Sequence, residues 1–508
     1  MEVSSPRFAG PDRGTAGDGR RKAAPPLGAH APSVSLPLRF VLTGLLALFL
    51  GVAGLVLRPE LLATYHYNQH VVAVTHLFTL GFITSIIMGA MYQLVPVALE
   101  TRLYSERLAR WQFLFHFVGF VGMVGMFWTW NLKQVGHFGS VMAVGVGLFV
   151  YNIARTLRRV PRWNVIATAV ASALGWLSLA VLAGLAVAAG KCTYEGAPQS
   201  AAAQSVAPVL AGLRATADFL SRFDPMSTMH AHAHLGGAGF FLLLIIGVSY
   251  KLVPMFTLSE LRSERRARWS VALLNLGLAG SFFAILLRSP LKPLCALVVI
   301  AGLAVYGVEM RAILRARRRR ALDWGLRYFL TAISLLGLLA LLALVLSWPK
   351  LPLTAFTGQL ENLYGFLALI GVVGLAILGM LYKILPFLVW YARYSREIGR
   401  GRVPALADLY SPRLQVAGYW TYLGGLAATS IAIVLGSTKL MPWGCGLLAL
   451  SILFFAVNAG RMLSHLVRPK VEPLAFRMPV KPGANANPNV RPRFTSAGTG
   501  AASQTLLS

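Results

Sequence analysis

HLFTLGFITSIIMGAMYQLVP, residues 76–96, decides the fold, because the chain contains two further versions of this phrase. The second is HLGGAGFFLLLIIGVSYKLVP, residues 234–254, and the third is FLALIGVVGLAILGMLYKILP, residues 366–386. The three align without a gap and share two glycines, a tyrosine and a final proline. Histidine opens the first two phrases, whereas phenylalanine opens the third. Repetition of this kind indicates an architecture of repeated units.

The composition indicates a membrane protein. Hydrophobic residues make up 56% of the chain and charged residues only 13%, and the mean hydropathy is +0.64. These values are typical of a chain that crosses the bilayer many times, not of a soluble enzyme. The net charge of +30 would suggest a nucleic-acid partner in a soluble protein. Here the basic residues fall in short loops between apolar runs, so we expect contact with the lipid bilayer and no nucleic-acid partner.

Apolar runs of about 20 residues predict the membrane spans. There are twelve, near residues 39–58, 69–95, 112–130, 137–154, 165–189, 229–254, 270–288, 293–311, 327–347, 362–388, 414–435 and 442–464. The predicted fold is therefore an all-α, polytopic bundle of twelve transmembrane helices, in three pseudo-repeated four-helix units. It occupies residues 38–465, between disordered basic tails at 1–37 and 466–508.

Arginine-rich loops follow the second, fourth, sixth, eighth and tenth predicted helices, whereas the short loops on the other side carry at most two basic residues each. Because cytoplasmic loops retain positive charge, both termini are predicted to be cytoplasmic, in a bacterial-type inner (plasma) membrane.

Two other repeated residues have ordinary structural interpretations. The prolines that close the phrases are expected to end their helices. The tyrosines are expected to form an aromatic belt at the cytoplasmic interface. These residues are Pro96, Pro254 and Pro386, and Tyr92, Tyr250 and Tyr382.

Histidines gather at the outer ends of two predicted helices. His70 and His76 belong to the second helix, and His230, His232 and His234 belong to the sixth. Neutral imidazole is a common ligand of transition metals and of haem iron. His230 and His234 share a helix face and His232 points nearly opposite, so one helix would serve two neighbouring sites, or supply one ligand and one residue that donates a hydrogen bond to a ligand. The alternative is that these rings bond to a hydroxyl or carbonyl of a neighbouring helix.

Twelve spans in three four-helix units, with outer histidines on helices 2 and 6, resemble the catalytic subunit I of the haem-copper oxidase superfamily. The phrases H-x-x-x-x-G-F…G-x-x-Y-x-L-V-P are similar to the second helix of cbb3-type cytochrome c oxidases and of the related nitric oxide reductases, and also to NnrS-like haem and copper membrane proteins. The resemblance covers about residues 38–465.

The resemblance implies cofactors and ligands. In that superfamily, helix 2 supplies a haem ligand, helices 6 and 7 supply the copper-site histidines, and helix 10 supplies two further haem ligands. His76, His234, His70 and His230 are therefore the candidate haem ligands, and the candidate copper ligands are His232, His230 and His234. The predicted helices 7 and 10 contain no histidine. We therefore expect a divergent relative with a depleted ligand set. It would bind fewer haems, or one haem between helices 2 and 6, and would not contain a complete oxidase centre.

The resulting hypothesis is an integral membrane haem-binding protein, with copper as a second candidate metal. It would transfer electrons, or bind or reduce O2 or NO, near the outer membrane face, beside other respiratory or membrane subunits. As an enzyme it would be an oxidoreductase of the terminal oxidase or nitric oxide reductase type. The alternatives are a multi-pass transporter or metal-ion permease, in which repeats are also common, and a non-catalytic accessory subunit.

Overall fold

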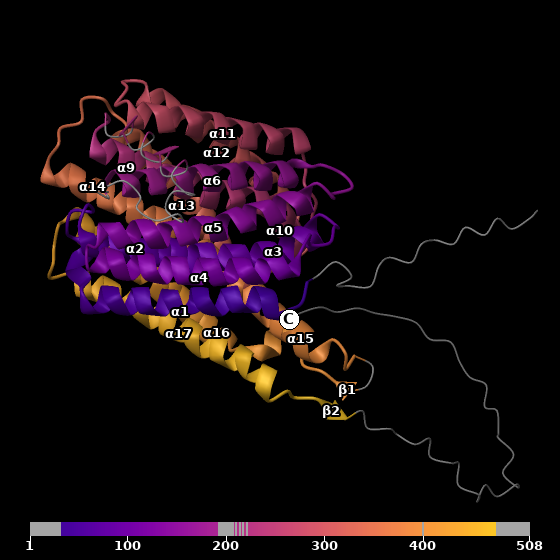
Figure 1. The fold of residues 1–508 in the computed structure, drawn as a ribbon. Coiled ribbons are helices and arrows are strands. Elements are labelled where there is room, and N and C mark those ends of the chain that lie inside the picture. The colour runs from indigo at the N-terminus through magenta and orange to yellow at the C-terminus, as the bar shows by residue number, and fades with distance from the viewer. Residues whose placement is uncertain are drawn as a thin grey trace, which may run out of the picture.

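The computed structural model describes residues 32–191, 222–398 and 401–473, with a few scattered residues between 192 and 221. Within these residues, eleven helices are long and apolar enough to cross a membrane. A further helix, α16 (Pro412–Val434), has a similar length but a lower hydropathy, and it completes a bundle of twelve. The predicted all-α polytopic bundle is confirmed (Figure 1). Most of both predicted tails lies outside the described residues.

The elements follow one order in all three units, and the second helix of each unit has three consecutive segments. The first unit comprises α1 (Ser35–Leu57), α2 (Gln69–His76), η2 (Leu77–Thr84), α3 (Ser85–Ala98), α4 (Glu106–Trp128) and α5 (Leu132–Leu157). The second comprises α6 (Val165–Lys191), α9 (Pro225–His234), η3 (Leu235–Leu242), α10 (Leu243–Thr257), α11 (Glu264–Leu286) and α12 (Lys292–Arg315). The third comprises α13 (Trp324–Leu346), α14 (Ala355–Phe366), η4 (Leu367–Gly374), α15 (Leu375–Tyr394), α16 and α17 (Met441–Val467). The short elements are η1 (Pro59–Leu62), η5 (Leu406–Leu409), and the antiparallel strands β1 (Gly401–Arg402) and β2 (Glu472–Pro473).

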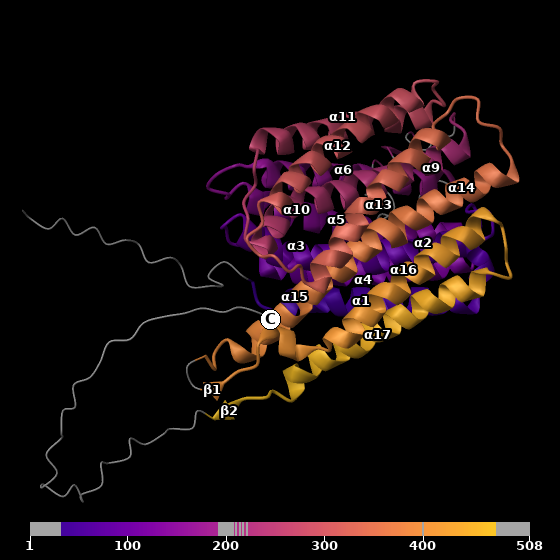
Figure 2. The same cartoon turned by 180° about the vertical axis from the view of Figure 1, so that it is seen from behind.

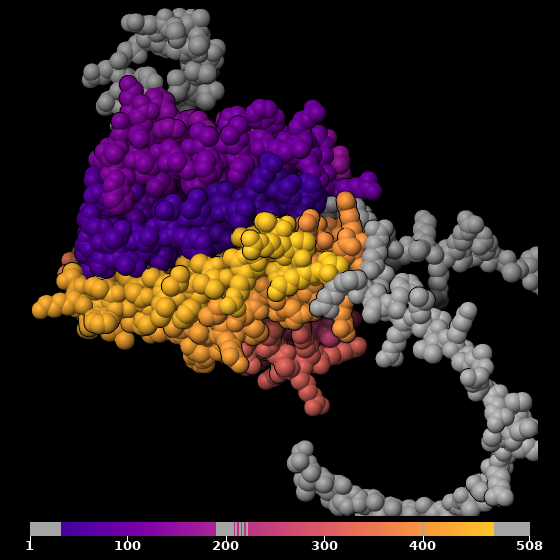
Figure 3. Space-filling model, turned by 90° about the horizontal axis from the view of Figure 1, so that it is seen from below, coloured from indigo at the N-terminus to yellow at the C-terminus, as the bar shows by residue number. Residues whose placement is uncertain are grey.

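The units pack as a closed ring with pseudo-threefold symmetry (Figure 1, Figure 2). In each unit the first helix packs on the second, and the third packs on the fourth. The last helix of each unit then contacts the first helix of the next: α5 contacts α6, α12 contacts α13, and α17 returns to α1. Figure 3 shows this closure, with the indigo start of the chain lying against its yellow end. The repeat in the sequence is thus a repeat in space.

The same polar arrangement holds the third and fourth helices of every unit together. A serine caps the third helix, and its backbone N–H donates to a side-chain oxygen that is buried on the fourth helix. The pairs are Ser105 with Asn152 at 3.1 Å, Ser263 with Glu309 at 2.8 Å, and Ser411 with Asn458 at 2.9 Å. A buried backbone group needs such a partner in an apolar medium, so these caps fix the helix ends against their neighbours.

The three second helices are long and contain π-helical segments. They extend over 30, 33 and 40 residues, and η2, η3 and η4 each begin directly after the first residue of a repeated phrase. In the first copy, the hydroxyl of Thr84 donates to the carbonyl of Thr79, five residues back, at 2.7 Å. π-helical segments are rare in proteins as a whole, but those that occur are often found at functional sites. The sequence did not predict these segments.

Two expectations about the repeated residues were wrong. Pro96, Pro254 and Pro386 lie inside α3, α10 and α15, because each helix continues for at least two residues beyond its proline. The repeated tyrosines are at most 2% exposed and form no interfacial belt. Two of them bond to buried amides of neighbouring helices: the hydroxyl of Tyr92 donates to Gln112 at 3.1 Å, and Asn458 donates to the hydroxyl of Tyr382 at 3.3 Å. The repeated tyrosines are therefore buried inside the bundle and not exposed at the membrane interface.

Candidate functional site

The three second helices meet inside the ring. The segment η4 contacts both η2 and η3, so the three repeated phrases adjoin one another. Figure 1 shows α2, α9 and α14 at one end of the bundle and α3, α10 and α15 at the other. The histidines of α2 and α9 therefore lie towards the same end.

His76 is the last residue of α2, directly before the π-helical segment. Its Nδ1–H donates to the carbonyl oxygen of Val72, one turn back, at 2.8 Å. Its ring lies against that of Phe127 of α4, with 4.5 Å between the ring centroids. This hydrogen bond places the proton on Nδ1, so that Nε2 is left with its lone pair. The tautomer is assigned from the hydrogen bond.

His234 repeats this geometry in the second unit. Its Nδ1–H donates to the carbonyl oxygen of His230 at 2.7 Å, which again leaves Nε2 as the acceptor. The hydroxyl of Tyr364, from α14, lies 3.4 Å from that Nε2, and the two rings are stacked. At the matching position of the third unit, Phe366 is buried and offers no ligand atom. The two repeated histidines are therefore oriented in the same way, and each has Nε2 as its unprotonated nitrogen.

Two of the three remaining predicted histidines, His232 and His70, have different neighbours. His232 lies near Gly184 of α6, its buried Nδ1 has no hydrogen-bond partner, and it is within electrostatic range of His76. His70 packs edge-on against Trp128 of α4, with 4.6 Å between the ring centroids.

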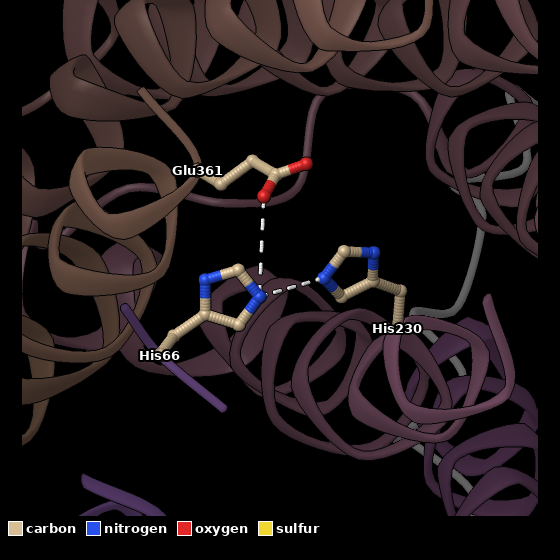
Figure 4. Close-up of side chains that lie close together, drawn as sticks. All are labelled: His66, His230 and Glu361. Carbon is tan, nitrogen blue, oxygen red and sulfur yellow. Dashed lines mark hydrogen bonds and ion pairs between the residues drawn. The ribbon is translucent and has the colours of Figure 1, made fainter. Parts of the chain in front are cut away.

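A separate polar cluster, formed by His66, His230 and Glu361, lies at the same end of these helices (Figure 4). His66, in the turn before α2, places Nε2 at 3.1 Å from Nε2 of His230 and at 3.9 Å from a carboxylate oxygen of Glu361. Its Nδ1 lies 3.2 Å from the amide oxygen of Asn362. Burial lowers the pKa of His66, and the bond to Asn362 acts in the opposite direction. The burial thus favours the neutral ring.

The structure separates the predicted ligands into groups. His76 and His234 occupy equivalent positions, but His230 reaches away from His234 towards His66. The sequence predicted that His230 and His234 share a face, and the structure gives their side chains different partners. His66, Glu361, Asn362 and Tyr364 were not among the predicted ligands, although a carboxylate directly before the predicted span 362–388 was a signal for Glu361.

Comparison with known proteins gives two matches. The family described as Cytochrome C and Quinol oxidase polypeptide I matches residues 28–135. A cryo-EM structure of a heme-copper terminal oxidase dimer is similar to this chain, with a TM-score of 0.57 and 12% sequence identity. The match covers 86% of this chain and 83% of that chain. The chain has the haem-copper oxidase fold. No curated protein sequence matches it.

These matches support the haem-copper oxidase subunit I superfamily, as the resemblance predicted. They also support a multi-pass, oxidase-type membrane subunit. The superfamily in general implies haem and copper, as well as a role in electron transport. The histidine set of this chain is partial by comparison. Neither α11 nor the helix built from α14, η4 and α15 contains a histidine.

The residues present fit haem ligation. Histidine ligates haem iron through an unprotonated ring nitrogen, which Nε2 of His76 and of His234 provides. The turn after His234 also has space: a Cβ added to Gly236 or Gly237 would meet no atom within 4 Å. In contrast, the apolar pocket lined by Phe78, Phe82 and residues of α1, η4, α16 and α17 has no histidine in its lining. That pocket has no axial ligand for haem, so the fit rests on the histidines of α2 and α9.

Proposed function

We propose that this chain is an integral membrane haem protein of the cytochrome c oxidase subunit I type, with His76 and His234 as the leading iron ligands. It transfers electrons, or binds or reduces O2 or NO, near the outer face of the membrane. Bound haem supplies an iron that changes oxidation state and binds diatomic molecules.

One observation carries the proposal. Both repeated histidines donate Nδ1–H to the backbone carbonyl four residues earlier. This bond fixes the ring orientation and leaves Nε2 unprotonated, which is the arrangement that orients a metal-binding histidine. A histidine that only joins two helices directs a nitrogen to a neighbouring helix. The described bond of His76 stays within its own helix, whereas Nε2 of His234 also lies 3.4 Å from the hydroxyl of Tyr364 on α14.

Tyr364 has the only hydroxyl with a described contact to His234. This hydroxyl lies 3.4 Å from Nε2 of His234. When Nε2 binds a metal, this hydroxyl no longer has the ring as an acceptor. It is then available to donate a hydrogen bond within the site.

Three other histidines are secondary candidates. His70 is a further candidate haem ligand on α2, and His230 is one on α9. The nitrogen of His230 faces His66, however, which favours a separate role. His232 is the remaining candidate for copper, because its buried Nδ1 lacks a partner.

The structure argues against a transporter as the main function. Transporter repeats typically present half-helices that are broken at mid-membrane. The second helices here continue unbroken over 69–98, 225–257 and 355–394. We further propose that the membrane is a bacterial-type inner membrane, with both termini in the cytoplasm and other respiratory subunits as partners. The arginine distribution supports this orientation.

The test is a reduced-minus-oxidised spectrum of the detergent-purified protein, with a pyridine hemochrome assay for haem content. We expect stoichiometric haem in the natural chain and loss of most of it in His76→Ala or His234→Ala. The matched control is His137→Ala, which alters an exposed histidine of α5. Added imidazole should restore the spectrum of a variant that folds but lacks its ligand. A colourless natural protein, or unchanged spectra in both variants, would refute the proposal.

A further inference from the structure

The cluster of His66, His230 and Glu361 draws one side chain from each unit of the ring. His66 belongs to the first unit, His230 to the second and Glu361 to the third. Their closest ligand atoms all lie within 4.8 Å of one another. Figure 4 shows the two rings and the carboxylate pointing at a common space. Residues that are far apart in the sequence therefore converge near the pseudo-threefold axis.

Asn362 fixes the orientation of His66. The amide nitrogen of Asn362 donates to the backbone carbonyl of Thr64 at 2.9 Å, so the amide oxygen faces the ring. That oxygen lies 3.2 Å from Nδ1 of His66 and accepts a hydrogen bond from its N–H. In the neutral ring, Nε2 then carries a lone pair. The lone pair is directed at Nε2 of His230 and at the carboxylate of Glu361.

A lone pair that faces a carboxylate is repelled unless a proton or a metal cation lies between them. The distances suit such a cation. Two nitrogens that bind one metal at about 2.1 Å each lie roughly 3.0 to 3.4 Å apart. The two Nε2 atoms are 3.1 Å apart, and the carboxylate oxygen is 3.9 Å from Nε2 of His66. A small rotation of the Glu361 side chain closes the remaining gap.

The surrounding charges and the donor types select the kind of ion. Asp224 interacts electrostatically with His230, whereas Lys292 acts on both His230 and Glu361. The site therefore has little surplus of negative charge. Ca2+ and Mg2+ need several oxygen ligands, while imidazole nitrogen binds Zn2+, Cu2+, Fe2+ and Ni2+.

We propose that His66, His230 and Glu361 bind one divalent transition-metal ion, with water in the remaining positions, and that this ion joins the outer ends of the three units. The site is separate from the haem ligands, because it does not use Nε2 of His76 or of His234. Asn362 acts as a positioning residue that holds the tautomer of His66.

The test is Zn2+ binding to the full chain in detergent. Chelator-treated protein is equilibrated with Zn2+, freed of excess, and analysed for metal by mass spectrometry and by calorimetric titration. We expect one tightly bound Zn2+ per chain, and at least a tenfold weaker affinity in His66→Gln and Glu361→Gln. His137→Ala is the matched control, since it removes an exposed histidine and should bind as the natural chain does.

The outcomes separate this proposal from the haem proposal. Glu361→Gln keeps the shape of the side chain, so its haem spectrum and elution volume should match those of the natural chain. Absence of Zn2+ binding by the natural chain would overturn the metal site, and so would equal binding by both cluster variants. The two histidines would then share only a hydrogen bond. If His76→Ala loses haem but still binds Zn2+, the result supports a metal site that is independent of the haem ligands.

Discussion

Asn362→Ala tests the metal site through a residue that never touches the ion. The substitution removes the acceptor of the Nδ1 proton of His66 and frees the carbonyl of Thr64. The ring of His66 is then free to turn, and its proton is no longer fixed on Nδ1. All three proposed ligands remain, so Zn2+ should still bind with one ion per chain, but more weakly.

The expected size of the effect follows from the lost hydrogen bond. Removal of a partner that orients a metal-binding histidine typically weakens metal affinity by 10- to 100-fold. This corresponds to about 1.4 to 2.7 kcal/mol of binding free energy. The free energy of unfolding should fall by only about 1 kcal/mol, because Asn362 and Thr64 are partly exposed and water can replace the lost bonds.

The assay is a competition titration of Zn2+ against a chelator of known affinity. Asn275→Ala is the control, because Asn275 also makes two hydrogen bonds, to Trp176 and to the carbonyl of Val271, both at 2.8 Å. It should lower stability by a similar amount and leave Zn2+ affinity unchanged. Equal Zn2+ affinity in the natural chain and in Asn362→Ala would refute the argument about the tautomer.

Two further predictions concern the fold. Glu309 is unexposed and accepts bonds from two backbone amides and an arginine. Glu309→Gln should lower the free energy of unfolding by about 1 to 3 kcal/mol, whereas the exposed pair of Glu264 contributes about 0.3 to 0.5 kcal/mol. Thermal melts at one scan rate compare the melting temperatures of Glu309→Gln and Glu264→Gln. Equal decreases in melting temperature would contradict the stabilising role of the buried Glu309 carboxylate. Gly379→Ala places Cβ 2.5 Å from the carbonyl oxygen of Gly325, so it should destabilise the bundle by about 1 to 3 kcal/mol. A Cβ added at Gly236 meets no atom within 4 Å, so Gly236→Ala should not destabilise the bundle. Equal melting temperatures of Gly379→Ala and Gly236→Ala would contradict the close packing at Gly379.

The sequence alone was enough to predict the helical bundle. A segment in a bilayer must satisfy its own backbone hydrogen bonds, so runs such as 39–58 and 165–189 predict helices without any knowledge of their neighbours. The constant register of the phrases at 76, 234 and 366 predicted the three units. It also drew attention to His76 and His234, because a polar ring repeated at one depth in lipid needs a partner.

Only the tertiary structure decided which side chains meet. His66 and Glu361 are brought to His230 by the closure of the ring, and the neighbours of a residue across that ring cannot be read from local periodicity. The same holds for two of the repeated tyrosines, Tyr92 and Tyr382, which bond to buried amides of other helices and do not lie at the membrane surface. Local patterns fix where a helix lies along the chain, because the bilayer acts on each segment separately. Contacts between segments depend on how all twelve helices pack together, which is why the cluster of His66, His230 and Glu361 became visible only in the folded chain.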